Sequence, residues 1–244
     1  MRLLVHWHIW YPEQVPWFVK KLRNIHGVEW DLYVTGKEEA MPMVKAFKPD
    51  AAFVPVKPVG YDIWPFISVL KAVDLGRYSH VLKLHTKNRA PKFIQLNGVW
   101  LPGYRWRNLL VNAIIGTPGR FENALSLADK GLVCQEILVK KLSKTNPVDN
   151  EMLREEAQAL GLQIKGNLFA TGTMFLARTE PFELFRKARV EAAHFEGASG
   201  THLSGSSAHV YERLLSLAVT SAGYEIVPVV TNRPATLWKS IVVR

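Results

Sequence analysis

The feature that most constrains this fold is the alternation of short apolar runs with helical segments in the first 85 residues. The runs cover residues 2–9, 30–34, 52–56 and 80–85, and each has the length of a β-strand. Between them, for example over residues 15–25, apolar side chains recur at the spacing of an amphipathic helix. Strands joined by helices lie parallel, with the helices on the faces of the sheet. The sequence therefore predicts an α/β fold with a Rossmann-type, mostly parallel sheet flanked by helices.

The second half of the chain is less regular. Residues 86–103 concentrate Asn, Pro and Gly, which predicts a long functional loop. Further on, the pattern predicts helices over 105–115, 151–160 and 208–222, strands over 168–176 and 225–230, and a Gly/Ser-rich loop over 197–207. No repeat or linker divides the chain, so we expect a single domain over residues 1–244, with a loosely packed tail after about residue 234.

Composition narrows the environment and the class of protein. No apolar run approaches the roughly 18 residues that span a bilayer. Cys134 is the only cysteine, so an intrachain disulfide is impossible and a reducing, cytoplasmic location is expected. The formal net charge of +10 favours anionic partners: nucleic acid, anionic lipid or phosphate-bearing small molecules. The absence of a P-loop, a G-x-G-x-x-G motif and a His-Glu-x-x-His motif argues against the enzyme classes that those motifs mark.

The most informative segment is Lys83-Leu84-His85-Thr86-Lys87. Because side chains alternate along a strand, Lys83, His85 and Lys87 project to one side if the extended geometry continues. They lie at the end of the fourth predicted strand, and open α/β sheets bind ligands beyond the carboxyl ends of their strands. Three cationic side chains at that place predict a phosphate or diphosphate site. The alternative is a strand with one solvated face.

A second segment is the turn that contains Gly60 and Asp62. Gly60 permits a close backbone approach or a positive φ. Asp62 stands shortly before Pro65, so its carboxylate either caps the following helix or binds a ribose or sugar hydroxyl. The residues alone leave these two interpretations even.

Small and hydroxyl-bearing residues interrupt the apolar run that predicts the strand over 168–176. Gly172 would let a sugar approach the backbone, and Thr171 and Thr173 would offer hydrogen bonds; the alternative is a core strand that begins with a bulge. On the first strand, His6 and His8 share a face. Because no acidic partner lies nearby in sequence, we interpret them as buried or substrate-facing rather than as metal ligands.

The predicted helix over 208–222 carries His209, Glu212 and Arg213 in its first turns. These residues and Ser216 fall on one face, away from the apolar stripe. The positive end of a helix attracts anions, so this helix would point an anion-binding terminus toward the preceding loop. The alternative is an exposed helix face with local ion pairs.

Taken in order, these segments resemble the rhamnan synthesis F family of bacterial polysaccharide enzymes. The resemblance runs from about residue 3 to about residue 226 and rests on these segments: residues 6–12, 31–35, 60–66, 82–87, 170–178 and 209–213. It implies a GT-A-like glycosyltransferase that moves a sugar, such as rhamnose or another deoxyhexose, from a nucleotide-sugar to a polysaccharide or lipid-linked glycan. Two departures stand out. Tyr61 replaces a frequent arginine, and Ser204-Gly205-Ser206-Ser207 replaces a loop that often carries an aspartate.

The resemblance also suggests how a donor is held. Most GT-A enzymes bind a divalent metal through an Asp-x-Asp motif at the end of the fourth strand, where this chain has Lys83-x-His85-x-Lys87. We expect these fixed cations to neutralise the departing nucleotide diphosphate without a metal cofactor. Gly60, Asp62 and Arg213 would complete the donor site. The alternative is a Mn²⁺- or Mg²⁺-dependent enzyme that uses Asp62 with His209.

An inverting transfer needs a base that deprotonates the acceptor hydroxyl. The candidates are Asp62, Glu196, His209 and Glu212, and we favour Glu212 because its helix opens toward the expected site. Asp62 is assigned to the donor as well. The segment of Thr171, Gly172 and Thr173, together with His8, would line the sugar and acceptor site.

The expected partners are a nucleotide-sugar donor and a lipid-linked or polysaccharide acceptor. Contact with anionic lipid would hold the protein peripherally at the inner face of the cytoplasmic membrane. Nucleic acid is not an expected partner. Two rival functions are a non-catalytic, basic nucleic-acid-binding protein and a degenerate transferase domain that serves as a scaffold.

Overall fold

The structure is a computed structural model that describes residues 1–88, 93–96, 99–142, 147–196 and 206–231. A seven-stranded sheet runs through it in the order β11-β7-β10-β4-β1-β2-β3. The strands of this sheet are β1 (Arg2–Ile9), β2 (Glu29–Gly36), β3 (Ala52–Phe53), β4 (His80–His85), β7 (Gly131–Gln135), β10 (Phe175–Arg178) and β11 (Glu225–Val229). All neighbours pair in parallel except β10, which is antiparallel to β4 and β7.

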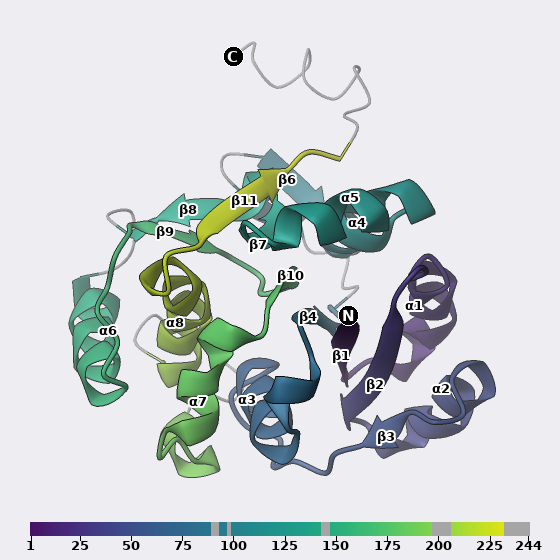
Figure 1. The fold of residues 1–244 in the computed structure, drawn as a ribbon, viewed down its shortest axis with the longest axis horizontal. Helices are drawn as coiled ribbons and strands as arrows, with labels where there is room; N and C mark the ends of the chain where they lie inside the picture. The colour runs from purple at the N-terminus through teal and green to yellow at the C-terminus, as the bar shows by residue number, and fades with distance from the viewer. Residues whose placement is uncertain (89–92, 97–98, 143–146, 197–205, 232–244) are drawn as a thin grey trace.

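Helices cover both faces of the sheet (Figure 1). One face carries α1 (Val15–Leu22), α2 (Met41–Phe47), α4 (Gly103–Ile115) and α5 (Pro118–Ala128). The other carries α3 (Ile63–Ala72), α6 (Pro147–Ala159), α7 (Glu183–Lys187) and α8 (Ser207–Ser221). The predicted α/β fold with a mostly parallel sheet flanked by helices is confirmed. No described helix is long and apolar enough to cross a membrane.

The central strands β1 and β4 are buried on both faces. Along β1, Leu3, Val5 and Trp7 belong to the core under α1 and α4, whereas Leu4 belongs to the core under α3. On the α3 side, the alternation continues from Leu4 to His6 and His8, where apolar residues would be expected. The sheet thus becomes polar toward the carboxyl ends of its central strands.

The parallel register gathers this polarity from three strands. His6 pairs with Lys83 and His8 with His85, while Thr35 of β2 pairs with His8 from the other side. Paired residues of neighbouring strands share a face, so these five side chains form one buried polar row. The ring nitrogens His6 Nε2 and His8 Nδ1 lie 2.9 Å and 3.0 Å from Thr35 Oγ1, which ties β1 to β2.

The strand predicted over 168–176 is divided. β9 (Leu168–Ala170) pairs with β8 (Val139–Lys141) outside the central sheet, and β10 begins only at Phe175. The turn between them has left-handed backbone at Gly172 (φ +82°) and Thr173 (φ +44°). Thr171, Gly172 and Thr173 interrupt the apolar run at this turn, but the apolar side chains on both sides led to the prediction of one continuous strand.

One further expectation needs correction, and part of the structure was not predicted. The loop predicted over 86–103 contains an antiparallel hairpin of β5 (Phe93–Leu96) and β6 (Val99–Pro102). The sequence pattern did not predict α5 or β7. Thr117 caps the start of α5 by accepting a hydrogen bond from Arg120 N at 3.3 Å, and a proline follows the cap. The predicted tail after residue 234 and residues 197–205 of the predicted Gly/Ser loop lie outside the described residues.

Candidate active site at the carboxyl edge of the sheet

Asp62 is the centre of a group of polar side chains where β4 ends. It holds the position before α3, yet its carboxylate makes no capping hydrogen bond, so the capping interpretation is wrong. Instead, Lys83 Nζ donates to Asp62 Oδ2, and Thr173 Oγ1 donates to the same oxygen at 2.5 Å. His85 Nδ1 lies 2.8 Å from this oxygen as well. We call Asp62, Lys83, His85 and Thr173 the Asp62 cluster.

Lys83 is fully buried and committed to this cluster. Besides the bond to Asp62, its ammonium donates to Thr173 O at 3.1 Å and to Thr173 Oγ1 at 3.0 Å. A lysine ammonium has three N–H groups, and all three are therefore used. Lys83 has none left for a phosphate, so we do not carry forward the direct diphosphate-binding role predicted for it.

The charges of the cluster follow from its burial. Burial alone would raise the pKa of the Asp62 carboxyl, but His85 and Lys83 hold that pKa well below its usual range. Burial lowers the pKa of His85 to about 3, so its imidazole is neutral at pH 7. Burial also lowers the pKa of Lys83, and the adjacent Asp62 opposes that change. Asp62 therefore stays ionised. The hydrogen bonds from Lys83 and Thr173 both go to Oδ2, and Oδ1 accepts none from the described residues.

Backbone strain is concentrated at this cluster. Among the described residues, Tyr61 (φ +54°) and Thr173 (φ +44°) are the non-glycine residues with positive φ. One precedes Asp62 and the other donates to it. Such a conformation costs on the order of 1–3 kcal/mol and persists only where the surroundings enforce it, most often at functional sites. The strain marks the cluster as more than an ordinary buried ion pair.

The start of α8 reaches both strained turns. Glu212 Oε1 accepts a hydrogen bond from Gly172 N at 2.7 Å. The His209 ring lies 6.3 Å from the Tyr61 ring, and its Nδ1 lies 2.8 Å from Ser206 Oγ at the helix cap. Glu212 and His209 are both partly exposed. The structure thus brings the two predicted α8 candidates to Tyr61 and Gly172, which adjoin residues of the Asp62 cluster in the chain.

Among the described residues, Lys87 is the member of the predicted cationic trio whose ammonium is neither hydrogen-bonded nor ion-paired. It is half-buried, with Nζ 3.8 Å from the centre of the Trp106 ring. No described residue makes a hydrogen bond or ion pair with its ammonium. Burial lowers the pKa of Lys87 to about 8, although Asp62 and Glu212 oppose this effect. The stacking contact with Trp106 had no signal in the sequence.

The rest of the predicted polar face of α8 is buried elsewhere. Arg213 forms a buried ion pair with Asp149 of α6 at 2.7 Å. Ser216 Oγ accepts a hydrogen bond from Ala170 N at 3.0 Å and is also buried. An exposed helix face is therefore wrong for these two residues. The structure does not bring Arg213 to the Asp62 cluster, and we leave it out of the proposed donor site.

Three other predicted residues have structural partners. Thr171 Oγ1 donates to Leu138 O at 2.8 Å. His8 is 7% exposed and contacts Thr35 within the polar row. Glu196 pairs with Lys57 at 2.5 Å, and both of these side chains are more than half exposed. Of the three, His8 lies on the same face of the sheet as His85 and stays in the candidate site.

Gly60 offers a direct test of how tightly this edge is packed. A Cβ at Gly60 (φ +66°) would stand 2.8 Å from the Phe195 ring, whereas a Cβ at Gly27 (φ +70°) would meet nothing within 4 Å. We expect Gly60→Ala to destabilise the fold by about 2–4 kcal/mol and Gly27→Ala by only about 1 kcal/mol, measured by urea denaturation. Equal losses in the two variants would show that Phe195 yields freely.

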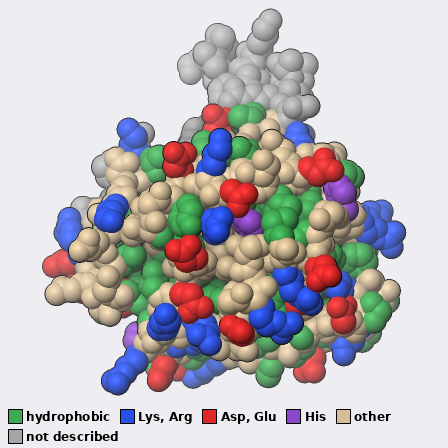
Figure 2. Space-filling model, in the orientation of Figure 1, with side chains coloured by type: hydrophobic (Ala, Val, Ile, Leu, Met, Phe, Trp, Pro, Cys, Tyr) green, Lys and Arg blue, Asp and Glu red, His purple; other side chains and the backbone are tan. Residues whose placement is uncertain are grey.

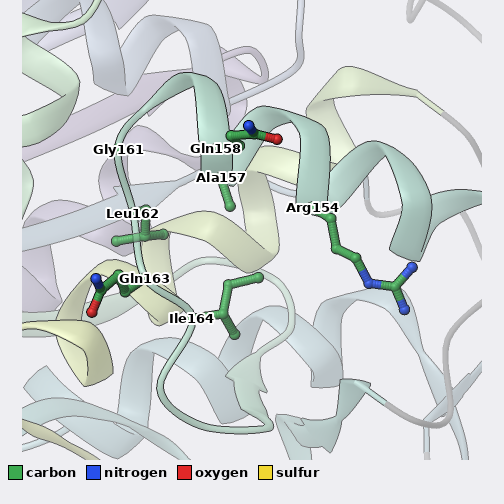
Figure 3. A pocket seen from close by; sticks show the side chains of 7 residues that line it. All are labelled: Arg154, Ala157, Gln158, Gly161, Leu162, Gln163 and Ile164. Carbon is green, nitrogen blue, oxygen red and sulfur yellow. The ribbon is translucent and has the colours of Figure 1, made fainter.

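A shallow hollow of about 430 Å³ lies away from this edge, at the end of α6 and the loop after it (Figure 3). Its lining falls between Arg154 and Ile164, and Arg154 is the only charged side chain there. It offers no group that could serve as a base or nucleophile. Among the described residues, no three His, Cys, Asp or Glu side chains group as ligands of a metal ion.

Comparison with known proteins connects this edge to a family. The sequence model described as Rhamnan synthesis protein F matches residues 1–224, which include the whole Asp62 cluster. Two proteins from two strains of Xanthomonas campestris pv. campestris, each described as Uncharacterized protein WxcX, are 30% identical to this chain over 179 residues. The match covers 70% of this chain but 24% of each relative. The chain thus spans about a quarter of the length of the curated relatives that it matches.

Proposed function

Because the chain belongs to the rhamnan synthesis protein F family, which connects it with polysaccharide synthesis, we propose that it is a glycosyltransferase. It moves a sugar, such as rhamnose or another deoxyhexose, from a nucleotide-sugar to a polysaccharide or lipid-linked glycan. The observation that carries this proposal is the Asp62 cluster. An ionised carboxylate, one oxygen of which accepts no hydrogen bond from the described residues, stands between two strained turns, at the sheet edge where α/β proteins bind ligands.

Lys87 is the proposed contact for the donor diphosphate. Its ammonium lies at the end of β4 on the Trp106 ring and has no anionic partner within bonding distance among the described residues. As the bond from the sugar to the diphosphate breaks, negative charge develops on the departing oxygen. A preplaced cation stabilises that charge without reorganisation. This assigns to Lys87 alone what the sequence had suggested for three side chains.

Asp62 is the proposed anchor of the donor sugar. Its Oδ2 is taken by the cluster, so Oδ1 is the oxygen that would accept a sugar hydroxyl. Cleavage of a glycosidic bond passes through a state with positive charge on the sugar ring. A carboxylate that stays ionised at every physiological pH stabilises that charge. The neutral His85 imidazole beside it adds no opposing charge.

Glu212 is the proposed general base. Gly172 N holds its Oε1, and Oε2 accepts no hydrogen bond from the described residues. In the proposed step, Oε2 takes the proton of the acceptor hydroxyl while the acceptor oxygen bonds to the anomeric carbon of the sugar. The bond from that carbon to the diphosphate breaks, and its electron pair leaves with the diphosphate. His209 is the alternative base, although its Nδ1 already faces Ser206.

Replacing Lys87 with methionine tests the donor site directly. We expect uridine diphosphate or thymidine diphosphate to bind about 10- to 100-fold more weakly by calorimetric titration, since one charge-assisted contact is lost. In the native protein, affinity should fall as the pH rises through about 8, because Lys87 then loses its proton. The matched control is Lys57→Met, which removes an exposed lysine paired with Glu196. Unchanged affinity in Lys87→Met would exclude the proposed role.

The metal-free mechanism remains part of the proposal. Lys87 would supply the positive charge that a divalent ion supplies elsewhere, so transfer should persist in EDTA and gain little from Mn²⁺ or Mg²⁺. Loss of transfer in EDTA and recovery on adding Mn²⁺ would instead favour the alternative, in which Asp62 and His209 contact the ion. Both assays use the purified chain with a nucleotide-sugar.

The setting that we propose is the inner face of the cytoplasmic membrane, where a nucleotide-sugar and a lipid-linked acceptor can meet. The net charge of +10 supports attraction to anionic lipid headgroups. A nucleic-acid-binding protein would instead gather its basic residues into one patch. On the face shown in Figure 2, Lys and Arg side chains are interspersed with Asp and Glu.

A further inference from the structure

Gln14 is a buried polar side chain whose amide reaches the backbone of Lys87. It ends the short 3-10 helix Pro12–Gln14 between β1 and α1 and is 1% exposed. Its Nε2 donates to Lys87 O at 2.5 Å, and its Oε1 accepts from Lys87 N at a longer 3.4 Å. The amide therefore pairs with Lys87 as a neighbouring strand would, two residues beyond the end of β4.

Helix α4 holds this amide from the other side. Arg107 NH1 donates to Gln14 Oε1 at 3.3 Å, and the Arg107 guanidinium lies 3.8 Å from the centre of the Trp17 ring. The preceding residue of α4 is Trp106, whose ring carries the Lys87 ammonium. Gln14 thus holds the backbone of Lys87 by hydrogen bonds, and Trp106 contacts its ammonium. Both contacts depend on α4, because Arg107 holds Gln14 and Trp106 lies against the ammonium.

We propose that Gln14 is a positioning residue, which fixes the backbone of Lys87 so that its ammonium stands where the donor diphosphate binds. This inference rests on the proposed role of Lys87. The loop after β1 does not need Gln14 to stay attached to β4, because Thr86 Oγ1 already accepts hydrogen bonds from Trp10 N and Tyr11 N at 2.9 Å and 3.1 Å. Beyond this attachment, Gln14 fixes the position of the Lys87 backbone.

The first test replaces Gln14 with methionine, which keeps the length of the side chain but removes both hydrogen bonds. We expect uridine diphosphate to bind about 10-fold more weakly, because a misplaced contact loses most of its value. The pH at which binding falls should rise above about 8, since a released Lys87 is less buried. A purely structural role would lower the denaturation midpoint and leave this pH profile unchanged.

A second variant tests the inference if Gln14→Met folds poorly. Gln14→Glu keeps an oxygen facing Arg107 but cannot donate to Lys87 O, so it should fold and bind uridine diphosphate about as weakly as Gln14→Met. Adding Gln14→Met to Lys87→Met should weaken binding no further than Lys87→Met alone. A further additive loss would show that Gln14 acts through something other than Lys87, and that result overturns the inference.

The inference and the proposed function fail differently. The reactivity of the Lys87 amine toward an acylating reagent, followed by peptide mass spectrometry across pH, needs no ligand and no activity. If Lys87→Met binds uridine diphosphate normally, the donor site is wrong, whatever Gln14 does. If Gln14→Met and Gln14→Glu leave the reactivity profile of Lys87 unchanged, Gln14 does not position Lys87.

Discussion

Replacing Asp62 with asparagine is expected to abolish measurable transfer and to destabilise the fold by about 3–5 kcal/mol. The structural loss arises because Lys83 is completely buried and would keep its charge without the carboxylate that balances it. The loss of transfer arises because an amide cannot replace a charge that stabilises the reacting sugar. Urea denaturation and a sugar-transfer assay measure the two effects separately.

The stability of the fold should fall on acidification because of Asp62. Burial opposes ionisation of Asp62, but His85 and Lys83 lower its folded pKa well below 3.8. The stability that Asp62 contributes is therefore present above pH 3.8 and lost as the pH falls toward the folded pKa. We expect the native protein to lose this contribution on acidification and Asp62→Asn to show no corresponding loss. Circular dichroism at a series of pH values measures it.

Two companion variants separate folding from chemistry. Asp50→Asn removes an exposed carboxylate paired with Lys48 and should cost at most about 1 kcal/mol. Combining Asp62→Asn with Lys83→Met removes the stranded charge, so most of the stability should return while transfer stays absent. Restored transfer in this double variant would contradict the role of Asp62 as sugar anchor.

Replacing Glu212 with glutamine is expected to lower kcat by about 10²- to 10⁴-fold with little change in stability. The glutamine side chain oxygen can still accept the hydrogen bond from Gly172 N, so the turn before β10 keeps its partner. Only the ability to take a proton is lost. Steady-state kinetics should therefore show a fall in kcat at a nearly unchanged KM for the donor.

Glu156→Gln is the matched control for Glu212→Gln. Glu156 of α6 accepts a hydrogen bond from Tyr211 OH at 2.8 Å. Tyr211 precedes Glu212 in the chain, but Glu156 makes no hydrogen bond or ion pair with the Asp62 cluster among the described residues. It should leave kcat within about threefold. If Glu212→Gln also stays within that range, His209 becomes the candidate base, and His209→Ala is the variant to examine next.

The strands of the first 85 residues were predictable because each is a short, mostly apolar run between helices of regular period, whereas β7, which also pairs in parallel, was not predicted. β10 was not predictable either, since the direction of a strand leaves no trace in its own residues, and the apolar stretch around Gly172 hides the turn. The candidate site lies at the edge to which the rule on carboxyl ends of strands points. Its inner pairing did not follow, because the contacts of Lys83 with Asp62 and Thr173 join residues 21 and 90 positions apart.

The reversed direction of β10 has a consequence for the edge of the sheet beside Asp62. β7 ends at the carboxyl edge, and because β10 is antiparallel to it, β10 begins at that same edge. The excursion over residues 136–174 therefore leaves the sheet and rejoins it on one side, carrying the Gly172 turn back to Asp62. Both ends of this segment lie at the carboxyl edge of the sheet, and its C-terminal end supplies Thr173 to the Asp62 cluster. A change of sequence or length within this segment would therefore alter the edge beside Asp62 while the register of the central sheet stays the same.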